Sequence, residues 1–525
     1  MTSCNENEAL LDFLSRPESY GLPADEKITR IDTHASYVFL AGGRAFKMKK
    51  PVTFSFLDFS TLEKRREICE RELELNRRTA PDIYLSVTPV RKTARGFHIG
   101  DAQGEPVEWL VEMKRFGDES LLATKAQKRD LTLSLVEELA GDVARFHTRA
   151  DVRREAGGAD NFAKIVADNE ADMKESIGPV FDARQAEHVT AASKRLIERH
   201  RALMDERRAT GWVRHCHGDL HLGNVAEIGG NPVIFDCIEF NDRIARIDVL
   251  YDLAFLLMDL GFRAQTDDRL AGYANRALNV YLDHVAQADI EPTTRGLALL
   301  PLFMATRAVV RAKVTAVQAK GAKAAEQRDL ARAYLGFAAR IVEPVEPRLV
   351  AVGGLSGTGK STLARALAAR LGGPAGAIHL RSDTIRKRLF GVRPLDRLPD
   401  EAYAPGAGAR VYDEMMRFAR ISLETGTSVI MDAVFAKATE RVEIGRLAEE
   451  TGTPLEGLWL EAPADVLEAR VAAREKDGRD PSDAGVEVLR KQLSYDLGPL
   501  DWDRVDASGT SKEAFGLARK ALHLR

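Results

Sequence analysis

The sequence has few cysteines and no cysteine pattern of a known kind. Its 525 residues include only four, and these form neither a CxxC pair nor the spacing of a zinc site. Sparse, unpatterned cysteines are typical of reduced thiols in a cytosolic protein and exclude a disulfide framework. We therefore expect a cytoplasmic protein with free thiols at Cys4, Cys69, Cys216 and Cys237.

Long apolar runs and a strong net charge are also missing. No run approaches the roughly 18 apolar residues that cross a bilayer, and the most apolar stretch, 250–260, is interrupted by Asp252 and Asp259. The polar, acidic N-terminus does not resemble a secretory signal. The net charge of −3 lacks the positive excess of proteins that bind nucleic acid or anionic membranes. We expect neither a membrane nor a nucleic acid as partner, and the sequence leaves the oligomeric state unknown.

The composition is that of a globular protein, with 45% hydrophobic and 30% charged residues. A chain of this length is too long for one hydrophobic core, and about three structural units are expected.

A group of polar residues surrounds a predicted hairpin. Residues 225–235 read as strand, turn and strand, with a pair of glycines to supply the positive φ angles of a tight turn. The hairpin places Asn224, before its first strand, beside Phe235 or Asp236 at the end of its second. Its open end therefore brings an amide oxygen and a carboxylate together, and both are ligands suited to Mg²⁺.

An acid lies just upstream, in the stretch His217-Gly218-Asp219-Leu220-His221-Leu222-Gly223-Asn224. Phosphoryl transfer needs one carboxylate to orient an acceptor hydroxyl, and oxygen ligands that hold metal against the phosphates of ATP. The stretch resembles the catalytic loop of the aminoglycoside phosphotransferase and choline kinase families, which are relatives of the protein kinases. The resemblance implies ATP and Mg²⁺ as cofactors, Asp219 as catalytic base, and Asn224 and Asp236 as metal ligands.

A second predicted hairpin, over residues 37–49, carries lysines on its outgoing strand. In this class of kinases a lysine at that place binds the α- and β-phosphates. Lys47 is the preferred candidate, although Lys49 shares its face of the strand and Lys50 follows. No GxGxxG motif precedes the strand, so the residues that cover the phosphates stay unassigned.

A helix is predicted to follow, and it carries a candidate partner for the lysine. Ser60 and Glu63 have the spacing of a capping box that opens a helix through about Arg78. Within that helix Glu72 lies in an apolar stripe, where an unpaired charge is costly. The kinase pattern implies a pair between Glu72 and Lys47, with Glu70 as the competing acid.

Strands at 84–92 and 106–113 lead to a segment where the resemblance places the adenine, near Glu112 and Met113. Helices are then expected over 128–148, 160–175, 182–208, 245–260, 267–285 and 295–343. By the same resemblance Asp252 supports the catalytic loop and Asp248 is a helix cap. Glu239 and Asp242 stand near the expected acceptor pocket.

A second phosphate-binding motif follows a proline-containing linker, 341–347. An apolar strand precedes Gly354-Leu355-Ser356-Gly357-Thr358-Gly359-Lys360-Ser361-Thr362, and a helix follows it. This is the P-loop pattern in its strand–loop–helix context. Its backbone N–H groups bind phosphates, Lys360 reaches the β- and γ-oxygens, and the Ser361 hydroxyl binds Mg²⁺.

The remainder resembles small P-loop kinases of the gluconate kinase, chloramphenicol phosphotransferase, zeta toxin and polynucleotide kinase type. The resemblance implies Asp383 as a catalytic base, with Arg386 as a substrate or phosphate contact. Asp432, at the end of a buried strand, matches the second metal-binding position. Arg474 and Arg479 are candidates to neutralise the migrating phosphoryl group.

These observations predict an α/β multidomain chain. We expect a bilobal kinase-like fold, with a β-rich lobe at 1–113 and a helical lobe at 114–340, a linker at 341–347, and a P-loop domain with a parallel sheet at 348–525. The expected function is a bifunctional ATP-dependent phosphotransferase that acts on hydroxyl groups of small molecules, such as a sugar or an aminoglycoside. Two alternatives stay open: that one domain is a nucleotide-sensing regulator of the other, or that the P-loop half is a polynucleotide 5′-hydroxyl kinase.

Overall fold

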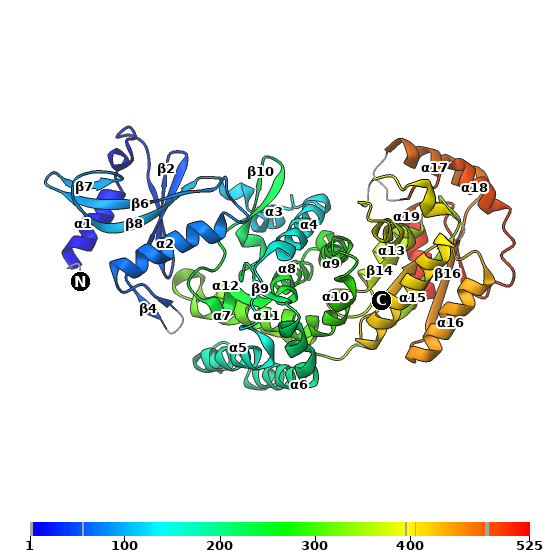
Figure 1. The fold of residues 1–525 in the computed structure, drawn as a ribbon. Helices are drawn as coiled ribbons and strands as arrows, with labels where there is room; N and C mark the ends of the chain where they lie inside the picture. The colour runs from blue at the N-terminus through cyan, green and yellow to red at the C-terminus, as the bar shows by residue number, and fades with distance from the viewer. Residues whose placement is uncertain (1–3, 55–56, 394–395, 405, 478–481, 525) are drawn as a thin grey trace. The chain divides into compact units, whose positions relative to one another are not determined.

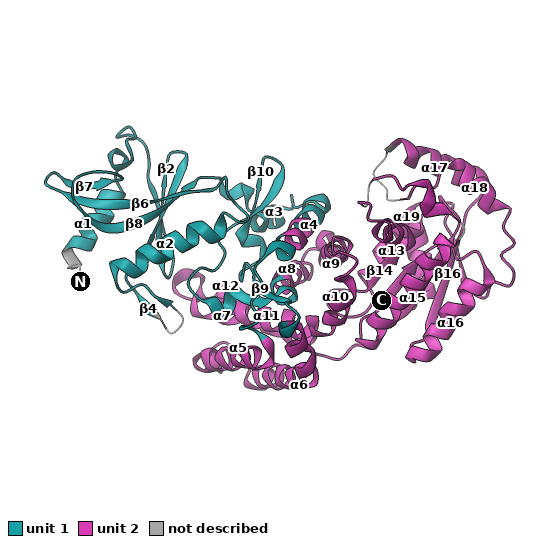
Figure 2. Cartoon of the chain, in the orientation of Figure 1, with its two compact units in different colours: residues 1–139, 146–157, 208–252 teal, residues 140–145, 158–207, 253–525 magenta. Residues whose placement is uncertain are grey.

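The computed structural model describes residues 4–54, 57–393, 396–404, 406–477 and 482–524. The chain forms two compact units, shown in teal and magenta in Figure 2. Unit 1 comprises residues 1–139, 146–157 and 208–252, and unit 2 comprises residues 140–145, 158–207 and 253–525. The domain boundaries predicted from the sequence lie at other residues than the borders of these units, and they remain predictions.

The N-terminal part of unit 1 is an antiparallel sheet with a helix on each face (Figure 1). Its six strands are, in spatial order, β1 (Thr29–Asp32), β2 (Ser36–Ala41), β3 (Arg44–Lys49), β8 (Glu105–Lys114), β6 (Tyr84–Thr93) and β7 (Gly96–Ile99). Leu10 and Leu14 of helix α1 (Cys4–Leu14) pack with Phe39 and Met48 on one face. The two predicted hairpin strands and the two strands before the expected adenine site are confirmed.

Helix α2 (Leu62–Asn76) packs on the other face through Cys69, which contacts Tyr84 and Val111. Its N-cap is Thr61, whose hydroxyl accepts from the backbone N–H of Lys64. The predicted cap at Ser60 is therefore wrong by one residue, because either hydroxyl at this point of the sequence suits an N-cap.

A buried ion pair holds α2 on the central strand. Arg65 of α2 and Glu108 of β8 are 5% and 4% exposed, and the guanidinium Nε lies 2.8 Å from one carboxylate oxygen. The same guanidinium donates to the carbonyl of Phe59, 3.0 Å away. This pair fixes the distance of α2 from the sheet, and with it the place of the acids that α2 carries.

The rest of unit 1 contains short elements, which include the predicted hairpin. These are β4 (Thr53–Phe54), β5 (Leu57–Asp58), α3 (Leu122–Lys128), β9 (Val213–His215), β10 (Val225–Ile228), β11 (Asn231–Ile234), α7 (Asp242–Ala245) and β12 (Arg246–Asp248). Strands β10 and β11 pair antiparallel with Val225 opposite Ile234, and Gly229 and Gly230 both have positive φ. The hairpin is confirmed.

Helices α4 (Leu133–Arg149) and α8 (Val249–Arg263) have residues in both units. Helix α6 (Ala183–Ala209) lies in unit 2 except for its last two residues. The helices that lie wholly in unit 2 before the P-loop are α5 (Gly158–Met173), α9 (Tyr273–Asp283), α10 (Ile290–Gly296), α11 (Leu300–Val317) and α12 (Ala324–Ile341). The single helix predicted over 295–343 is wrong. Gly321, with φ of 67°, turns the chain between α11 and α12, which pack against each other.

Unit 2 ends in a five-stranded parallel sheet, confirming the predicted P-loop fold. Its strands are, in spatial order, β14 (Ile378–Arg381), β15 (Val429–Asp432), β13 (Leu349–Gly354), β16 (Leu455–Glu461) and β17 (Asp503–Asp506). The helices around it are α13 (Lys360–Ala368), α14 (Ser382–Leu389), α15 (Ala407–Glu424), α16 (Ala438–Thr451), α17 (Ala464–Asp477), α18 (Val486–Leu493) and α19 (Ser511–Ala521). Helices α13 and α19 bury Leu363, Leu367 and Ala518 against the sheet.

Among the helices that the structure describes, none combines the length and the apolar character needed to span a bilayer. Cys69, Cys216 and Cys237 are buried free thiols.

The Arg65–Glu108 pair provides a test of how α2 is held. Replacing Arg65 with Leu, or Glu108 with Leu, should lower the free energy of unfolding by about 3–5 kcal/mol, because each change leaves one buried charge unpaired. The double variant should cost less than the sum of the two single variants. Urea unfolding of the four proteins measures these values, and strictly additive effects would show that the two charges do not interact.

Candidate active sites

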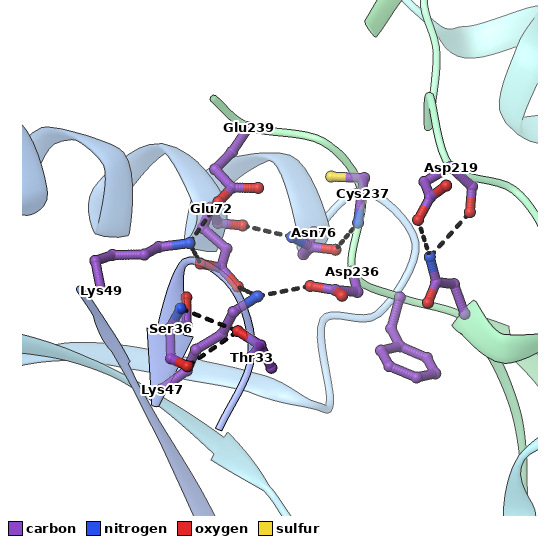
Figure 3. A network of polar contacts seen from close by, with 12 residues as sticks. Thr33, Ser36, Lys47, Lys49, Glu72, Asn76, Asp219, Asp236, Cys237 and Glu239 are labelled. Atoms are coloured by element: carbon purple, nitrogen blue, oxygen red, sulfur yellow. Dashed lines mark hydrogen bonds and ion pairs between the residues drawn. The ribbon is translucent and has the colours of Figure 1, made fainter. Parts of the chain in front are cut away.

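A buried cluster of charges lies where the predicted lysine strand meets α2 (Figure 3). Lys47 Nζ lies 2.8 Å from Glu72 Oε1 and 2.7 Å from Asp236 Oδ1. The predicted pair of Lys47 and Glu72 is thus present. The competing acid, Glu70, is exposed and pairs with Arg66 on the outer face of α2. One lysine therefore joins the helix acid to the predicted metal ligand.

Lys49 forms a second pair that the sequence did not reveal. It is 1% exposed, its Nζ lies 2.6 Å from Glu72 Oε2, and it also pairs with Glu239. Glu72 thus holds one lysine with each carboxylate oxygen. The alternation of Lys47 and Lys49 on one strand face was the only sequence signal for this arrangement.

The charges in this cluster set each other's protonation. Burial raises the pKa of Glu72, but Lys47 and Lys49 outweigh burial and lower it to about 2. Burial lowers the pKa of Lys47, but Asp236 and Glu72 outweigh it and hold that pKa well above its ordinary value. Burial raises the pKa of Glu239, and Lys49 offsets this only in part. Three carboxylates face two ammonium groups, so the fully ionised cluster keeps one negative charge.

The hairpin brings Asp219, Asn224 and Asp236 together at its open end. The backbone N–H of Phe235 donates to the Asn224 carbonyl at 3.0 Å, within the predicted range of register. The Asn224 side-chain amide donates to the Asp219 carbonyl and to Asp219 Oδ2, at 2.9 and 2.8 Å. Asp236 has φ of 62°, a left-handed conformation that Asp tolerates better than most residues. Its backbone N–H donates to the hydroxyl of Tyr84.

These residues suit a magnesium ion. The Asn224 amide nitrogen is taken up by Asp219, which leaves the amide oxygen as the atom directed to a ligand. Asp236 uses Oδ1 for Lys47 and has a side chain 43% exposed, so its other oxygen is accessible. Amide and carboxylate oxygens are hard ligands, and the surplus negative charge of the cluster favours a cation beside them. The donor set therefore fits the metal that the sequence predicts.

Asp252 binds the backbone of the predicted catalytic loop, residues 217–224. Its two carboxylate oxygens accept the backbone N–H groups of His217 and Gly218, each at 2.9 Å, and one of them lies 3.2 Å from His147 Nε2. The predicted support by Asp252 is therefore present. Cys216 lies within 4.8 Å of both His147 and Asp252, but the backbone and imidazole contacts already use the carboxylate, which indicates a structural role.

His217 is neutral and fixed in one tautomer. Its Nδ1 accepts from the N–H of Asp219, while Nε2 lies 2.9 Å from the carbonyl of Phe235 and donates to it. Burial lowers its pKa, which agrees with an uncharged imidazole. Asp248 also has its predicted place, because its carboxylate caps α8 by accepting from the N–H of Leu250.

Two further predictions concern residues around this cluster. Glu112 and Met113 lie inside β8, and the Glu112 carboxylate accepts from Ser86 and pairs with Arg44. Their contact with adenine stays a prediction. Glu239 and Asp242 do not form an open acidic pocket, because Glu239 is buried on Lys49 and Asp242 pairs with Arg71 and Arg246.

The turn between β1 and β2 is a feature that the sequence reading missed. The Thr33 hydroxyl accepts from the N–H of Ser36, and the Ser36 carbonyl accepts from the N–H of Thr33. Figure 3 shows both residues beside Lys47. This turn, without glycine, occupies the position in which a glycine-rich motif was sought.

In unit 2 the P-loop borders a cavity of about 620 Å³. Its lining includes the predicted residues Ser356, Gly357, Gly359, Lys360, Ser361, Thr362, Asp383, Arg386, Asp432 and Arg474. Gly354, Gly357 and Gly359 all have positive φ. A Cβ on Gly357 would lie 2.8 Å from the carbonyl of Leu467, so only glycine fits there. Thr358 is buried and holds the loop by donating to the Leu355 carbonyl.

Lys360, Arg381 and Asp432 are charged groups that line this cavity, and Arg381 and Asp432 are buried. Lys360 donates to the carbonyl of Leu355 at 2.9 Å. Burial lowers its pKa, and Arg474 and Arg381 add to that effect against the opposing pull of Asp432 and Asp383. Asp432 is 2% exposed, and His379, Arg381 and Lys360 overcome burial to lower its pKa to about 2. The Ser361 hydroxyl and the ionised Asp432 are both oxygen ligands suited to Mg²⁺.

The acceptor side of the cavity contains Asp383, in the first turn of α14, and Arg386 one turn later. Arg386 donates to the carbonyl of Ala402 and lies over the ring of Tyr403. Arg474 donates to the carbonyl of Ala484. Arg479 lies outside the described residues.

Two contacts around the cavity were not predicted. Buried Lys387 lies 3.3 Å from Asp483 Oδ1, and Asp483 Oδ2 accepts from the hydroxyl of Tyr403 at 3.0 Å. Gln492 of α18 accepts from the N–H of Ser356 at 2.8 Å. The first set of contacts joins α14 to the segment that carries Asp483, and the second joins α18 to the P-loop.

Comparison with known proteins matches the two parts of the chain to two families. Residues 67–289 match the Phosphotransferase enzyme family and residues 349–496 match an AAA domain family. An uncharacterized protein of Mycobacterium tuberculosis (strain ATCC 25618 / H37Rv) is 31% identical over 501 residues, which are 93% of this chain and 94% of that protein. The chain belongs to the same family as this mycobacterial protein. It joins a phosphotransferase-family domain to a P-loop kinase domain, and it is a kinase.

Two further comparisons concern single halves of this kinase. An adenylyl-sulfate kinase of Myxococcus xanthus is 38% identical over 117 residues, which are 22% of this chain and 59% of that protein. A solved choline/ethanolamine kinase family protein from Mesorhizobium loti is 12% identical to this chain and has a TM-score of 0.36. The match covers 64% of this chain and 98% of that protein's chain.

The cluster predicts a pH dependence of stability in this kinase. The pKa of Glu72 falls from 4.5 to about 2 on folding, so its ionised form stabilises the folded state above pH 4.5. This contribution is lost as the pH falls from 4.5 toward 2. Glu72→Gln should lower the free energy of unfolding near neutral pH by about 3–5 kcal/mol and flatten its decline in the acid range.

Urea unfolding at several pH values, followed by tryptophan fluorescence, measures this effect. Glu70→Gln is the matched control on the same helix, because its exposed pair with Arg66 should contribute only about 0.5 kcal/mol or less. Equal effects of the two substitutions would contradict the assigned role of the cluster.

Proposed function

We propose that this kinase is bifunctional, with two separate ATP sites that each transfer a phosphoryl group to a hydroxyl of a small molecule. The observation that carries the proposal is the same in both units. Each unit gathers a lysine, an exposed acid and a pair of oxygen ligands around one point, and phosphoryl transfer needs these groups.

In the first site, the oxygen of the acceptor hydroxyl attacks the γ-phosphorus, and Asp219 accepts the proton of that hydroxyl. The bond between that phosphorus and the ADP oxygen breaks, and ADP leaves. Asn224 orients Asp219 through the bond to Oδ2, while Lys47 binds the α- and β-phosphates. Asn224 and Asp236 would hold Mg²⁺, which would neutralise charge on the phosphates. The turn at Thr33–Ser36 covers the phosphates of ATP, and Glu112 and Met113 border the adenine.

In the second site, the backbone N–H groups of the P-loop and Lys360 bind the phosphates. Ser361 and Asp432 would hold Mg²⁺. Asp383 accepts the hydroxyl proton, with a side chain 35% exposed toward the cavity. Arg474 neutralises charge on the transferred group, and Arg386 contacts the acceptor. The cavity of about 620 Å³ is of a size for a small molecule rather than a polymer.

The nucleotide-sensing alternative predicts one site that binds without turnover. Both sites keep every group that transfer needs, which favours two active sites. Nothing observed in either unit favours loss of one activity.

The polynucleotide alternative rests on basic residues between Arg381 and Arg397. Contacts of this stretch argue against it. Lys387 is 1% exposed and pairs with Asp483, and Arg381 faces Asp383. Arg388 contacts Gln287, and Arg393 pairs with Asp396. The exposed arginines of this stretch are Arg393 and Arg397, and two side chains make a small surface for a phosphodiester backbone.

A screen for ADP formation with sugars, aminoglycosides, nucleosides and oligonucleotides tests the proposal. Asp219→Asn keeps the shape of the base but removes its charge, and it should reduce one set of activities by about 10²–10⁴-fold. Lys360→Ala should reduce a different set by at least about 10²-fold. Each variant is the control for the other, because Asp219→Asn should leave the activities of the second site unchanged and Lys360→Ala should leave those of the first site unchanged.

Other outcomes would decide against two independent transferases. Loss of all activities in both variants would indicate one reaction under the control of the second site. Turnover of oligonucleotides that falls steeply with salt would support the polynucleotide alternative, and salt-insensitive turnover of a small acceptor would exclude it.

A further inference from the structure

Helix α9 lies along the edge of the P-loop sheet, and both belong to unit 2 (Figure 1). The edge strand is β14, whose backbone groups on its outer side have no neighbouring strand. Asn275 donates through Nδ2 to the carbonyls of Ala375 and Ala377, at 2.8 and 2.9 Å. The helix thus satisfies backbone groups that an exposed edge would leave to water or to another chain.

Asn279 binds the same edge through both the nitrogen and the oxygen of its side-chain amide. Its Nδ2 donates to the carbonyl of Ala377 at 3.2 Å, and its Oδ1 accepts from the N–H of His379 at 2.7 Å. A carbonyl and an N–H two residues apart are what a neighbouring strand would bind. Asn279 is 6% exposed, so these bonds are shielded from water. The backbone of His379 is therefore held from the side of the helical region.

The side chain of His379 leads from this edge into the proposed second site. Its Nε2 lies 3.1 Å from Asp432 Oδ2, and both side chains are almost fully buried. Asp432 lines the cavity together with Lys360, Ser361 and Asp383. Because His379 occupies Oδ2, the other carboxylate oxygen is the one directed to a metal.

We propose that Asn279 is a positioning residue of the P-loop site: it fixes His379, which in turn fixes the carboxylate of Asp432 for Mg²⁺. The inference rests on the proposed metal-binding role of Asp432. It assigns to residues before the linker a part in the second reaction. Groups that orient a metal ligand typically change metal affinity or activity by about 10–100-fold when removed.

A merely structural role of Asn279 is the competing explanation, and the same packing contains a suitable control. Arg417 of α15 pairs with Glu291 of α10 and with Glu414 of its own helix, and neither ion pair involves a residue of β14. Arg417→Ala therefore loosens the attachment of the helical region without touching His379 or Asp432. A positioning role and a structural role predict different results for these two substitutions.

The test is calorimetric titration of ADP over a range of Mg²⁺ concentrations. The full chain carries Asp236→Asn, which removes the proposed metal ligand of the first site. In this background Asn279→Ala should raise the half-saturating Mg²⁺ concentration by about 10-fold, with little change in ADP affinity without Mg²⁺. His379→Phe should cause a similar rise, His379→Gln should restore part of it by keeping an N–H donor, and Arg417→Ala should leave it unchanged.

Two results would separate the possible failures. If Lys360→Ala leaves ADP binding intact in this background, the proposed second ATP site itself is wrong. If Lys360→Ala weakens ADP binding but Asn279→Ala and Arg417→Ala have the same Mg²⁺ dependence as the parent, the ATP site stands and the positioning role of Asn279 is overturned.

Discussion

The carboxylate of Glu72 contacts Lys47 with one oxygen and Lys49 with the other, in a place where water is excluded. The first proposed site of this kinase depends on that contact, because it joins α2, β3 and the segment after β11. Lys47 continues to Asp236 and Lys49 continues to Glu239, so the segment that carries the metal ligand is held at two points. Removing either lysine would leave buried carboxylates without compensation, which is costly in a low-dielectric interior.

The two sites balance their charges in different ways. In the first, three carboxylates face two lysines, and the surplus negative charge lies next to the accessible side chain of Asp236. In the second, arginines add positive charge around Lys360, which agrees with a place for phosphate oxygens. A cation is expected to complete the first arrangement and an anionic nucleotide the second. Both arrangements are typical of phosphoryl transfer, where charge neutralisation does most of the catalytic work.

Sequence reading succeeded where a function needs residues close together along the chain. The hairpin between Asn224 and Asp236, the strand with Lys47 and the P-loop were all found, since turn glycines and short spacings specify them. Sequence reading failed where the local sequence is compatible with more than one structure and long-range packing decides between them. The split between α11 and α12 falls at Gly321 within an otherwise helical pattern. Lys49 was considered only as an alternative to Lys47, and its burial and its pairs with acids were not predicted.

The sequence by itself determined the chemistry of this kinase: which acids, lysines and glycines are present, and which of them share a loop. Tertiary structure alone decided what these groups contact. Glu239 is distant in sequence from Lys49, and Asn279 is distant from His379, yet each pair is in contact. Local spacing cannot encode such pairs, because they form only when separate elements pack and exclude water. The pairing of buried charges and the satisfaction of a sheet edge are properties of the folded chain.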